Sequence, residues 1–299
     1  MNNVPSPRMN AELLLMFTLG CDRAYLFAHS DQEITAEEHS RYERALAERS
    51  RGVPAQYITG HQEFWGMDLI VSPAVLIPRP ETEHVIETVL ELAGNSAAQA
   101  AERRQNADHG ASRGLAPQQN QAPEERKKLR IVDVGTGSGC IALTLAKELP
   151  EAEIHATDIS SQALEVARAN AARHQLEQRV HFREADLLNG IDGPFDYVVS
   201  NPPYVGESEE DTVQLEVRKF EPRNAVFAGK TGTEVIAHLI PQAHAILQPG
   251  GWLVMEISGT IAEKVGKLLV GWENVQIKPD LQSIPRVALA RKPVSRPDH

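Results

Sequence analysis

The feature that most constrains the fold is an alternation of short apolar runs with helical segments between residues 129 and 290. The expected strands are 129–134, 153–157, 179–183, 197–200, 252–257, 275–278 and 287–290. Helical patterns separate them at 138–149, 160–174, 233–247 and 260–270, and a long loop is expected at 205–232. Strands that alternate with helices in this way predict an α/β fold built on a parallel sheet.

A glycine-rich loop follows the first of these strands. It consists of Gly135, Thr136, Gly137, Ser138 and Gly139. Glycines at this point permit a tight turn and let a ligand approach the backbone, although close packing of a helix on a strand also favours them. The dinucleotide fingerprint needs its third glycine one position later, where the chain has Cys140, and this argues against NAD or FAD.

Acidic residues end the expected strands next to this loop. Asp158 ends the second strand, where an acidic residue hydrogen-bonds ribose hydroxyls; the alternative is a helix cap. Asp186 and Leu187 follow the third strand. We expect Asp186 to accept the amine of an adenine ring and Leu187 to line the adenine slot, with a plain turn as the alternative. Asp133 is expected to orient the loop or to meet a ligand ammonium group.

The sequence Asn201-Pro202-Pro203-Tyr204 follows a buried strand that ends at Ser200. In open α/β sheets, ligands bind at the carboxyl ends of the strands. The prolines stiffen the loop and remove two backbone donors, so the Pro202 carbonyl and the Asn201 side chain are rigid acceptors beside the flat ring of Tyr204. Such a loop is suited to a planar group that carries an NH2. A proline-rich turn that only ends the strand is the alternative.

Composition narrows the class of protein. Of the 299 residues 41% are hydrophobic and 24% are charged, and the formal net charge is −11, which disfavours a general nucleic-acid binder. The two cysteines, Cys21 and Cys140, have no metal or redox spacing, and the 11 histidines form no metal motif, so we expect no metal and a cytoplasmic location. No apolar stretch is long enough for a membrane span.

The remaining segments predict three further parts. Residues 1–53 read as a small domain of short helices, with a capping box at Thr35 and Glu38. Residues 54–75 contain aromatic and β-branched pieces, including Gln56–Gly60, that suggest a β-hairpin linker. The main domain is expected at 76–299, with a flexible insertion at about 94–128 that is too poor in apolar residues to fold.

Taken together, the glycine loop, Asp158, Asp186 and the Asn-Pro-Pro-Tyr loop resemble the class I S-adenosylmethionine-dependent methyltransferases. The resemblance narrows to the bacterial peptide chain release factor glutamine methyltransferases, the HemK/PrmC family. The segments that carry it are Ala11–Leu15, Gln56–Gly60, Phe64–Gly66, Ile77–Glu83 and Phe220–Ala225. It covers nearly the whole chain except 94–128, and the family's Asp-x-x-Gly-x-x-Arg ending is reduced to Asp280 and Arg286.

The resemblance implies a Rossmann-like, seven-stranded, mostly parallel sheet with a small N-terminal helical domain that docks the substrate. The donor is S-adenosylmethionine and the product is N5-methylglutamine in the Gly-Gly-Gln loop of class 1 release factors. Asn201 and Pro202 accept the amide N–H bonds of the substrate, and Pro203 and Tyr204 complete its site. Arg79 and Glu81 contact the cofactor or substrate, or belong only to a proline-stiffened joint between domains. A monomer is expected.

Three alternatives remain. A DNA adenine-N6 or RNA guanine-N2 methyltransferase also uses Asn-Pro-Pro-Tyr, but the acidic charge and the lack of a basic recognition domain disfavour it. A glutamine methyltransferase of ribosomal protein L3 is a closer alternative than these, and the residue sequence of Ile77–Glu83 favours the release-factor branch over it. A non-catalytic S-adenosylmethionine-binding scaffold is disfavoured by the intact Asn201 and Tyr204.

Overall fold

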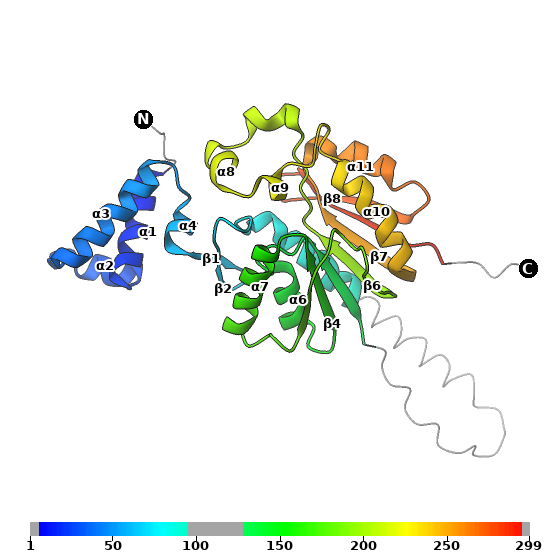
Figure 1. Ribbon diagram of the computed structural model, residues 1–299, viewed down its shortest axis with the longest axis horizontal. Coiled ribbons are helices and arrows are strands. Elements are labelled where there is room, and N and C mark those ends of the chain that lie inside the picture. The colour runs from blue at the N-terminus through cyan, green and yellow to red at the C-terminus, as the bar shows by residue number, and fades with distance from the viewer. Residues whose placement is uncertain (1–5, 95–127, 295–299) are drawn as a thin grey trace, which may run out of the picture.

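A computed structural model describes residues 6–94 and 128–294. Its main sheet has seven strands in the order β5-β4-β3-β6-β7-β9-β8, and β9 alone runs antiparallel to its neighbours (Figure 1). The strands are β3 (Arg130–Val134), β4 (Glu153–Asp158), β5 (Val180–Glu184), β6 (Phe195–Ser200), β7 (Leu247–Glu256), β8 (Glu273–Pro279) and β9 (Pro285–Arg291). The predicted seven-stranded, mostly parallel sheet is confirmed.

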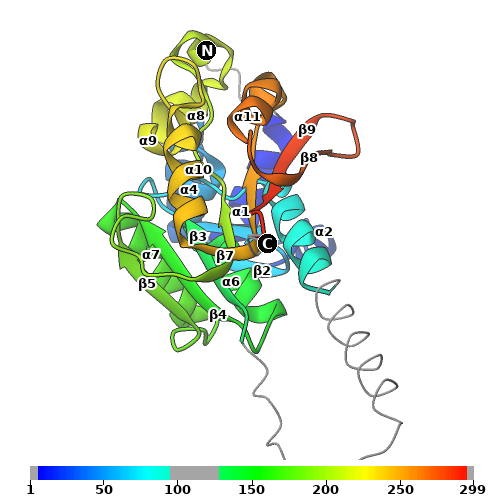
Figure 2. The same ribbon diagram turned by 90° about the vertical axis from the view of Figure 1, so that its right-hand side faces the viewer.

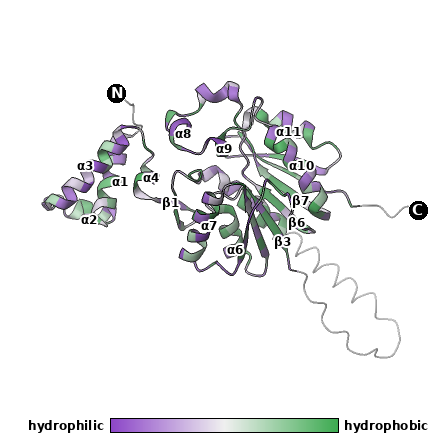
Figure 3. Ribbon diagram, viewed as in Figure 1, coloured by the Kyte–Doolittle hydropathy of each residue, from purple (hydrophilic) through white to green (hydrophobic). Residues whose placement is uncertain are grey.

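Both faces of this sheet are covered, because side chains of successive strand residues point to opposite faces. Ile131 packs in one hydrophobic cluster with α6 (Cys140–Glu148), α7 (Ser161–Arg173) and the helix at 83–94. Val132 packs in a second cluster with α10 (Glu234–Ile246) and α11 (Ala262–Leu268). Helices α10 and α11 lie on the other side of the sheet from α6 and α7 (Figures 1 and 2). Strands β3, β6 and β7 are accordingly apolar along most of their length (Figure 3).

The N-terminal helices form a separate unit beside the sheet domain (Figure 1). They are α1 (Pro7–Leu19), α2 (Arg23–Ala28) and α3 (Ala36–Ser50). The predicted capping box is present: the Thr35 side chain accepts from the Glu38 N–H, and Glu38 accepts from the Thr35 N–H. Buried Arg49 at the end of α3 holds this unit to the sheet domain through an ion pair of 2.9 Å with Glu216.

The linker differs from the prediction in its first part. Residues Ala55–Thr59 form a short helix, α4, and not a strand of the hairpin. Pro54 precedes the helix with φ near the value that its ring fixes, and Gly60 ends it in the left-handed region with its N–H bonded to the Gln56 carbonyl. The hairpin consists only of β1 (His61–Phe64) and β2 (Met67–Ile70).

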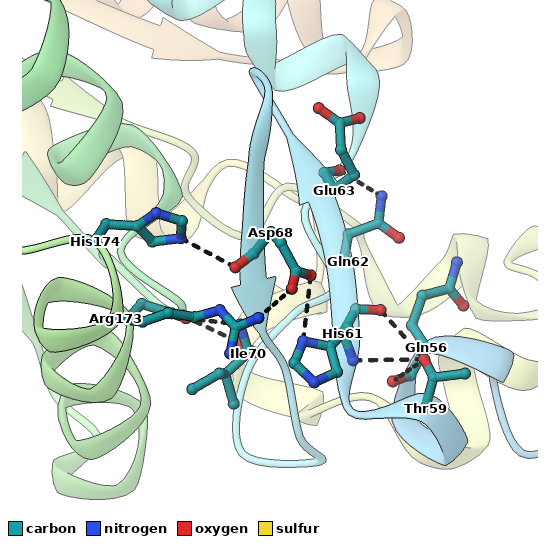
Figure 4. Close-up of polar contacts among 10 residues, drawn as sticks. Gln56, Thr59, His61, Gln62, Glu63, Asp68, Ile70, Arg173 and His174 are labelled. Atoms are coloured by element: carbon teal, nitrogen blue, oxygen red, sulfur yellow. Dashed lines mark hydrogen bonds and ion pairs between the residues drawn. The ribbon is translucent and has the colours of Figure 1, made fainter. Parts of the chain in front are cut away.

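The hairpin is fixed to α7 by polar contacts (Figure 4). Arg173 forms an ion pair with Asp68, and His174 Nε2 lies 3.0 Å from the Asp68 carbonyl. The buried Asn170 accepts from the Ile70 N–H and donates both to the Ile70 carbonyl and to the Ser138 carbonyl. The linker is therefore connected directly to the glycine-rich loop.

The expected long loop at 205–232 is instead broken into short helices. These are η2 (Glu207–Thr212), α8 (Leu215–Phe220) and α9 (Arg223–Val226). They are too short and too polar to show a helical period in the sequence, since η2 is almost entirely acidic or hydroxylated. Most of the insertion expected at 94–128 lies outside the described residues. Among the described helices, none has the length and apolar character needed to cross a bilayer.

Candidate active site

A cavity of about 330 Å³ lies at the carboxyl ends of β3, β4 and β6, next to the glycine-rich loop. We refer to it as the glycine-loop cavity. Most of the residues predicted to hold a cofactor line it: Gly135, Thr136, Gly137, Ser138, Asp158, Asp186, Leu187 and Asn201. Pro203 lines it as well, together with Leu76, Pro78 and Thr82 from the segment that precedes the first sheet-domain helix. Parallel strands deliver these loops to one edge of the sheet, which explains why residues far apart in the chain meet there.

The glycines of the loop have different roles. Gly135 and Gly137 have φ of 70° and 54°, and a Cβ at either would meet nothing within 4 Å, so their backbone is open to a ligand. Gly139 does not line the cavity. A Cβ there would lie 3.1 Å from Leu143 and 3.3 Å from Ala167, and φ is 84°, so both the left-handed backbone and the close packing of helices favour glycine.

Asp158 is held by the backbone around the cavity. Its carboxylate accepts from the Gly137 N–H and the Ser160 N–H, both at 2.9 Å. The cap of α7 is Ser160, whose side chain accepts from the Ala163 N–H, so the helix-cap alternative for Asp158 does not hold. Burial raises the pKa of Asp158 despite these hydrogen bonds.

Asp133 lies beneath the same loop and is fully buried. Its Oδ2 accepts from the Thr136 hydroxyl at 2.6 Å and from the Ala142 N–H at 3.2 Å, whereas its Oδ1 has no protein partner. Burial raises the pKa of Asp133 to about 7. The hydroxyl of Ser138 is also buried without a partner. A buried polar atom without a hydrogen bond lowers the stability of the fold. The unpaired Asp133 Oδ1 and Ser138 Oγ are therefore a sign that a polar ligand group binds near this loop.

A second cavity of about 360 Å³ adjoins the first, and we refer to it as the Tyr204 cavity. Asn201 lines both cavities and so lies at their junction. Charged side chains are frequent in the second one: Arg79, Glu81, Glu256 and Arg286. Pro202 is buried and is not among the residues that line either cavity.

A chain of hydrogen bonds runs behind this junction. Asn201 Nδ2 donates to Thr82 Oγ1 at 3.1 Å, and Thr82 Oγ1 donates to Glu256 Oε2 at 2.6 Å. Tyr204 Oη donates to Glu256 Oε1 at 3.2 Å. Glu256 is buried at the end of β7, and burial raises its pKa to about 7. Burial and the neighbouring Glu256 also raise the pKa of the Tyr204 hydroxyl.

Arg79 connects the Tyr204 cavity with the short helices after β6. It forms an ion pair with the buried Glu221, which also accepts from the Ile77 N–H at 3.1 Å. Burial raises the pKa of Glu221 more than Arg79 lowers it. The sequence segments Ile77–Glu83 and Phe220–Ala225 are therefore in contact, and Glu221 braces the segment that carries Thr82.

The sequence motifs indicated no role for Thr82 or Glu256, and Arg286 was interpreted only as a remnant of the Asp-x-x-Gly-x-x-Arg ending. Glu256 gave one signal, a carboxylate at the end of an apolar strand run. Arg286 lines the Tyr204 cavity, and its Nε is held at 2.9 Å by Asp280 Oδ2. Among the described residues, no group of three or more histidine, cysteine or acidic side chains is placed to bind a metal.

Comparison with known sequences shows which protein family the chain is similar to. The sequence model of the PrmC N-terminal domain matches residues 1–60, and that of the methyltransferase small domain matches 105–219. The release factor glutamine methyltransferase of Koribacter versatilis is 52% identical over 98% of this chain and 94% of its own length. That of Chlorobaculum tepidum is 39% identical over 95% of this chain and 90% of its own length.

The chain belongs to the release factor glutamine methyltransferase family. The family resemblance that the motifs indicated is thus confirmed. Among solved structures, a methyltransferase from Pyrococcus furiosus covers 87% of this chain and 100% of its own, with a TM-score of 0.51 and 17% identity. That likeness supports the fold alone, which is the class I methyltransferase fold.

Proposed function

We propose that this protein transfers a methyl group from S-adenosylmethionine to N5 of the glutamine in the Gly-Gly-Gln loop of class 1 peptide chain release factors. The observation that carries the proposal is the position of Asn201, which lines both cavities and therefore lies between a cofactor site and a substrate site. Relatives that are named for this reaction and match nearly the whole chain support the substrate.

The substrate nitrogen needs help because the lone pair of an amide is delocalised. Asn201 uses Nδ2 for Thr82, so its Oδ1 is left as an acceptor for one N–H of the substrate amide. An acceptor placed there orients the nitrogen and favours the positive charge that develops on it during transfer. The Tyr204 ring closes one side of the substrate cavity. The methylated amide loses its extra proton readily, so a dedicated base is not required.

The glycine-loop cavity fits the cofactor. The open backbone at Gly135 and Gly137 admits its amino-acid part, and Ser138, which lines the cavity, has a hydroxyl without a protein partner that a polar group of the cofactor can satisfy. Asp133 lies beneath the loop and orients it through Thr136. Asp158 is placed for ribose hydroxyls, and Asp186 with Leu187 for adenine. S-adenosylmethionine supplies, when bound, an electrophilic methyl group on a sulfonium.

The N-terminal helices, residues 1–53, are the proposed docking domain for the release factor. Large apolar side chains on α1 support this, since Met9 is 60% and Phe17 is 49% exposed. Residues 54–75 are the proposed linker and 76–299 the methyltransferase domain. We further propose a cytoplasmic monomer that needs neither a membrane nor stable nucleic-acid binding.

The test is mass spectrometry of purified release factor after incubation with this protein and S-adenosylmethionine. Duplex DNA and ribosomal protein L3 are incubated in parallel, and Asn201→Ala is the control variant. One added methyl on the Gly-Gly-Gln glutamine, absent with the variant, is the expected result. Methylation of DNA or L3 instead would overturn the substrate, and no methylation with bound cofactor would favour a scaffold.

A further inference from the structure

Thr82 joins the active site from a segment that is far from the other site residues in the sequence. It ends a short 3-10 helix, η1 (Pro80–Thr82), that precedes the sheet domain, and it lies against the ends of β6 and β7 with 1% of its surface exposed. Its hydroxyl contacts Asn201, 119 residues away, and Glu256, 174 residues away. The hydroxyl thus stands between the loop that meets the substrate and a buried carboxylate.

The ionised form of Glu256 sets the order of donors and acceptors in these hydrogen bonds. An ionised carboxylate can only accept, so in that state the single hydroxyl proton of Thr82 is directed to Glu256 at 2.6 Å. The lone pairs of Thr82 Oγ1 then remain for Asn201, whose Nδ2 donates at 3.1 Å. Because Nδ2 is committed to Thr82, Asn201 keeps Oδ1 for the side that faces the cavities.

The reverse orientation of Asn201 would harm the reaction. Rotation of the amide by half a turn would place Nδ2 where the substrate amide arrives, so two NH2 groups would meet. It would also face Oδ1 toward Thr82, whose only proton is already used by Glu256. The hydrogen bonds from Asn201 through Thr82 to Glu256 therefore select one of two amide orientations. The two have nearly the same shape, but one presents an acceptor to the substrate and the other a donor.

We infer that Thr82 and Glu256 are positioning residues for methyl transfer, which hold the Asn201 amide with its oxygen toward the glutamine amide of the substrate. This inference rests on the proposed function and deepens it. It gives a role to the Ile77–Glu83 segment, whose prolines and whose Arg79–Glu221 ion pair keep Thr82 in place. Thr82 also lines the glycine-loop cavity and Glu256 the Tyr204 cavity, and the role assigned to both is the one that they exert through Asn201.

The experiment compares Thr82→Val, which has nearly the same shape but no hydroxyl, with Thr82→Ser, which keeps the hydroxyl. Turnover is measured on release factor by mass spectrometry, and the Kd for S-adenosylmethionine is measured by calorimetry. For Thr82→Val we expect kcat to fall by about 10- to 100-fold, which is the loss expected when a reacting group is held out of position. Thr82→Ser should recover most of the wild-type kcat, and both variants should keep the cofactor Kd within about threefold.

Thr144→Val is the matched control. Thr144 is also fully buried, and its hydroxyl donates only to the Cys140 carbonyl of its own helix at 2.7 Å, so its kcat should stay near that of wild type. Glu256→Gln is a second variant in case Thr82→Val folds poorly. A glutamine amide can donate to Thr82 and so reverse the direction of the hydrogen bonds between Glu256, Thr82 and Asn201. We therefore expect kcat to fall by at least about fivefold.

The outcomes separate this inference from the proposed function. If wild-type protein leaves release factor unmethylated, the proposed function is wrong. If wild type is active and the folded Thr82→Val variant matches Thr82→Ser in kcat, Thr82 does not position Asn201. A double variant gives a further criterion: in an Asn201→Ala background, Thr82→Val should have no added effect on single-turnover transfer, and an additive loss would overturn the inference.

Discussion

The two cavities of the site are built in different ways. The glycine-loop cavity is fixed by contacts that are short in sequence: Thr136 to Asp133 spans three residues, and Gly137 to Asp158 spans 21. The Tyr204 cavity is fixed by contacts from Thr82 to Glu256 over 174 residues and from Arg79 to Glu221 over 142. One strand–helix–strand unit supplies the glycine loop and Asp158, although Thr82 and Asn201 from other segments complete that cavity, whereas these two contacts of the second cavity join distant segments.

This difference has a physical consequence. Contacts between distant segments form only after large loops close, and each must compensate a buried polar group at both ends. Burial raises the pKa of Glu221 and of Glu256, so the ionisation of these two groups near the Tyr204 cavity depends on their partners. We therefore expect variants on the substrate side to affect turnover and stability, and variants on the loop side to affect cofactor affinity.

The largest expected effect is that of Asn201→Ala on turnover. Loss of the acceptor that faces the substrate should lower kcat by about 100- to 1,000-fold, as removal of a key transition-state hydrogen bond does. The cofactor Kd should change little, because the glycine loop and Asp158 are untouched. Steady-state kinetics and calorimetry measure the two quantities. A large loss of cofactor affinity with kcat preserved would contradict the division between the cavities.

Asp133→Asn should separate stability from cofactor binding. The folded-state pKa of Asp133, about 7, lies above the ordinary value of 3.8, so its contribution to stability is complete below pH 4 and is lost as the pH rises through 7. Between pH 5 and pH 8 this loss is on the order of 3 kcal/mol. Asparagine keeps an oxygen for Thr136 and Ala142 and carries no charge.

The Asp133→Asn variant should therefore be the more stable protein at pH 5 and at pH 8, and the difference should be larger at pH 8. Some pH dependence should persist, because Glu256 has a pKa raised to about 7 as well. Its Kd for S-adenosylmethionine should rise, since the unpaired Oδ1 is replaced by a donor. Thermal unfolding at both pH values and calorimetry test this. Equal midpoints at pH 8 would show that Asp133 is not a source of instability.

Arg79→Ala should destabilise the fold by about 2 kcal/mol, because it leaves the buried Glu221 carboxylate without its cation. The side chain of Glu221 is only 1% exposed, whereas that of Arg79 is 33% exposed. In the double variant with Glu221→Gln, most of the lost stability should return, since the unpaired charge is gone. Urea unfolding of the two variants measures this, and failure of the second change to restore stability would contradict the assignment.

The smallest expected effect is that of Glu216→Gln at the contact between the N-terminal helices and α8. The side chain of Glu216 is 24% exposed, and the buried Arg49 keeps its hydrogen bonds to Asn10 Oδ1 and the Val53 carbonyl, so we expect a loss of about 1 kcal/mol of stability. We expect KM for release factor to rise by about two- to fivefold with kcat unchanged, because docking and not chemistry is altered. A fall in kcat alone would place the N-terminal helices in the chemical step.

Much of the fold and half of the site were predictable from the sequence. The strand–helix alternation gave the seven-stranded sheet, and the glycine loop with Asp158 gave the glycine-loop cavity, because both are local patterns. The glycine loop was interpreted too broadly only at Gly139, where packing against Ala167 is a tertiary contact. The helix at Ala55–Thr59 was missed because five residues are too few to show a helical period.

The sequence by itself determined the alternation of strands and helices, the loop and the Asp158 that line the glycine-loop cavity, and the family. Only the tertiary structure decided which way Asn201 faces, since that depends on a hydroxyl at Thr82 and a carboxylate at Glu256 that no spacing relates to it. The physical reason is the range of the interactions. Dihedral preferences and hydrophobic periodicity act within a few residues, whereas a hydrogen bond between buried groups acts on whichever segments the closed fold brings within reach.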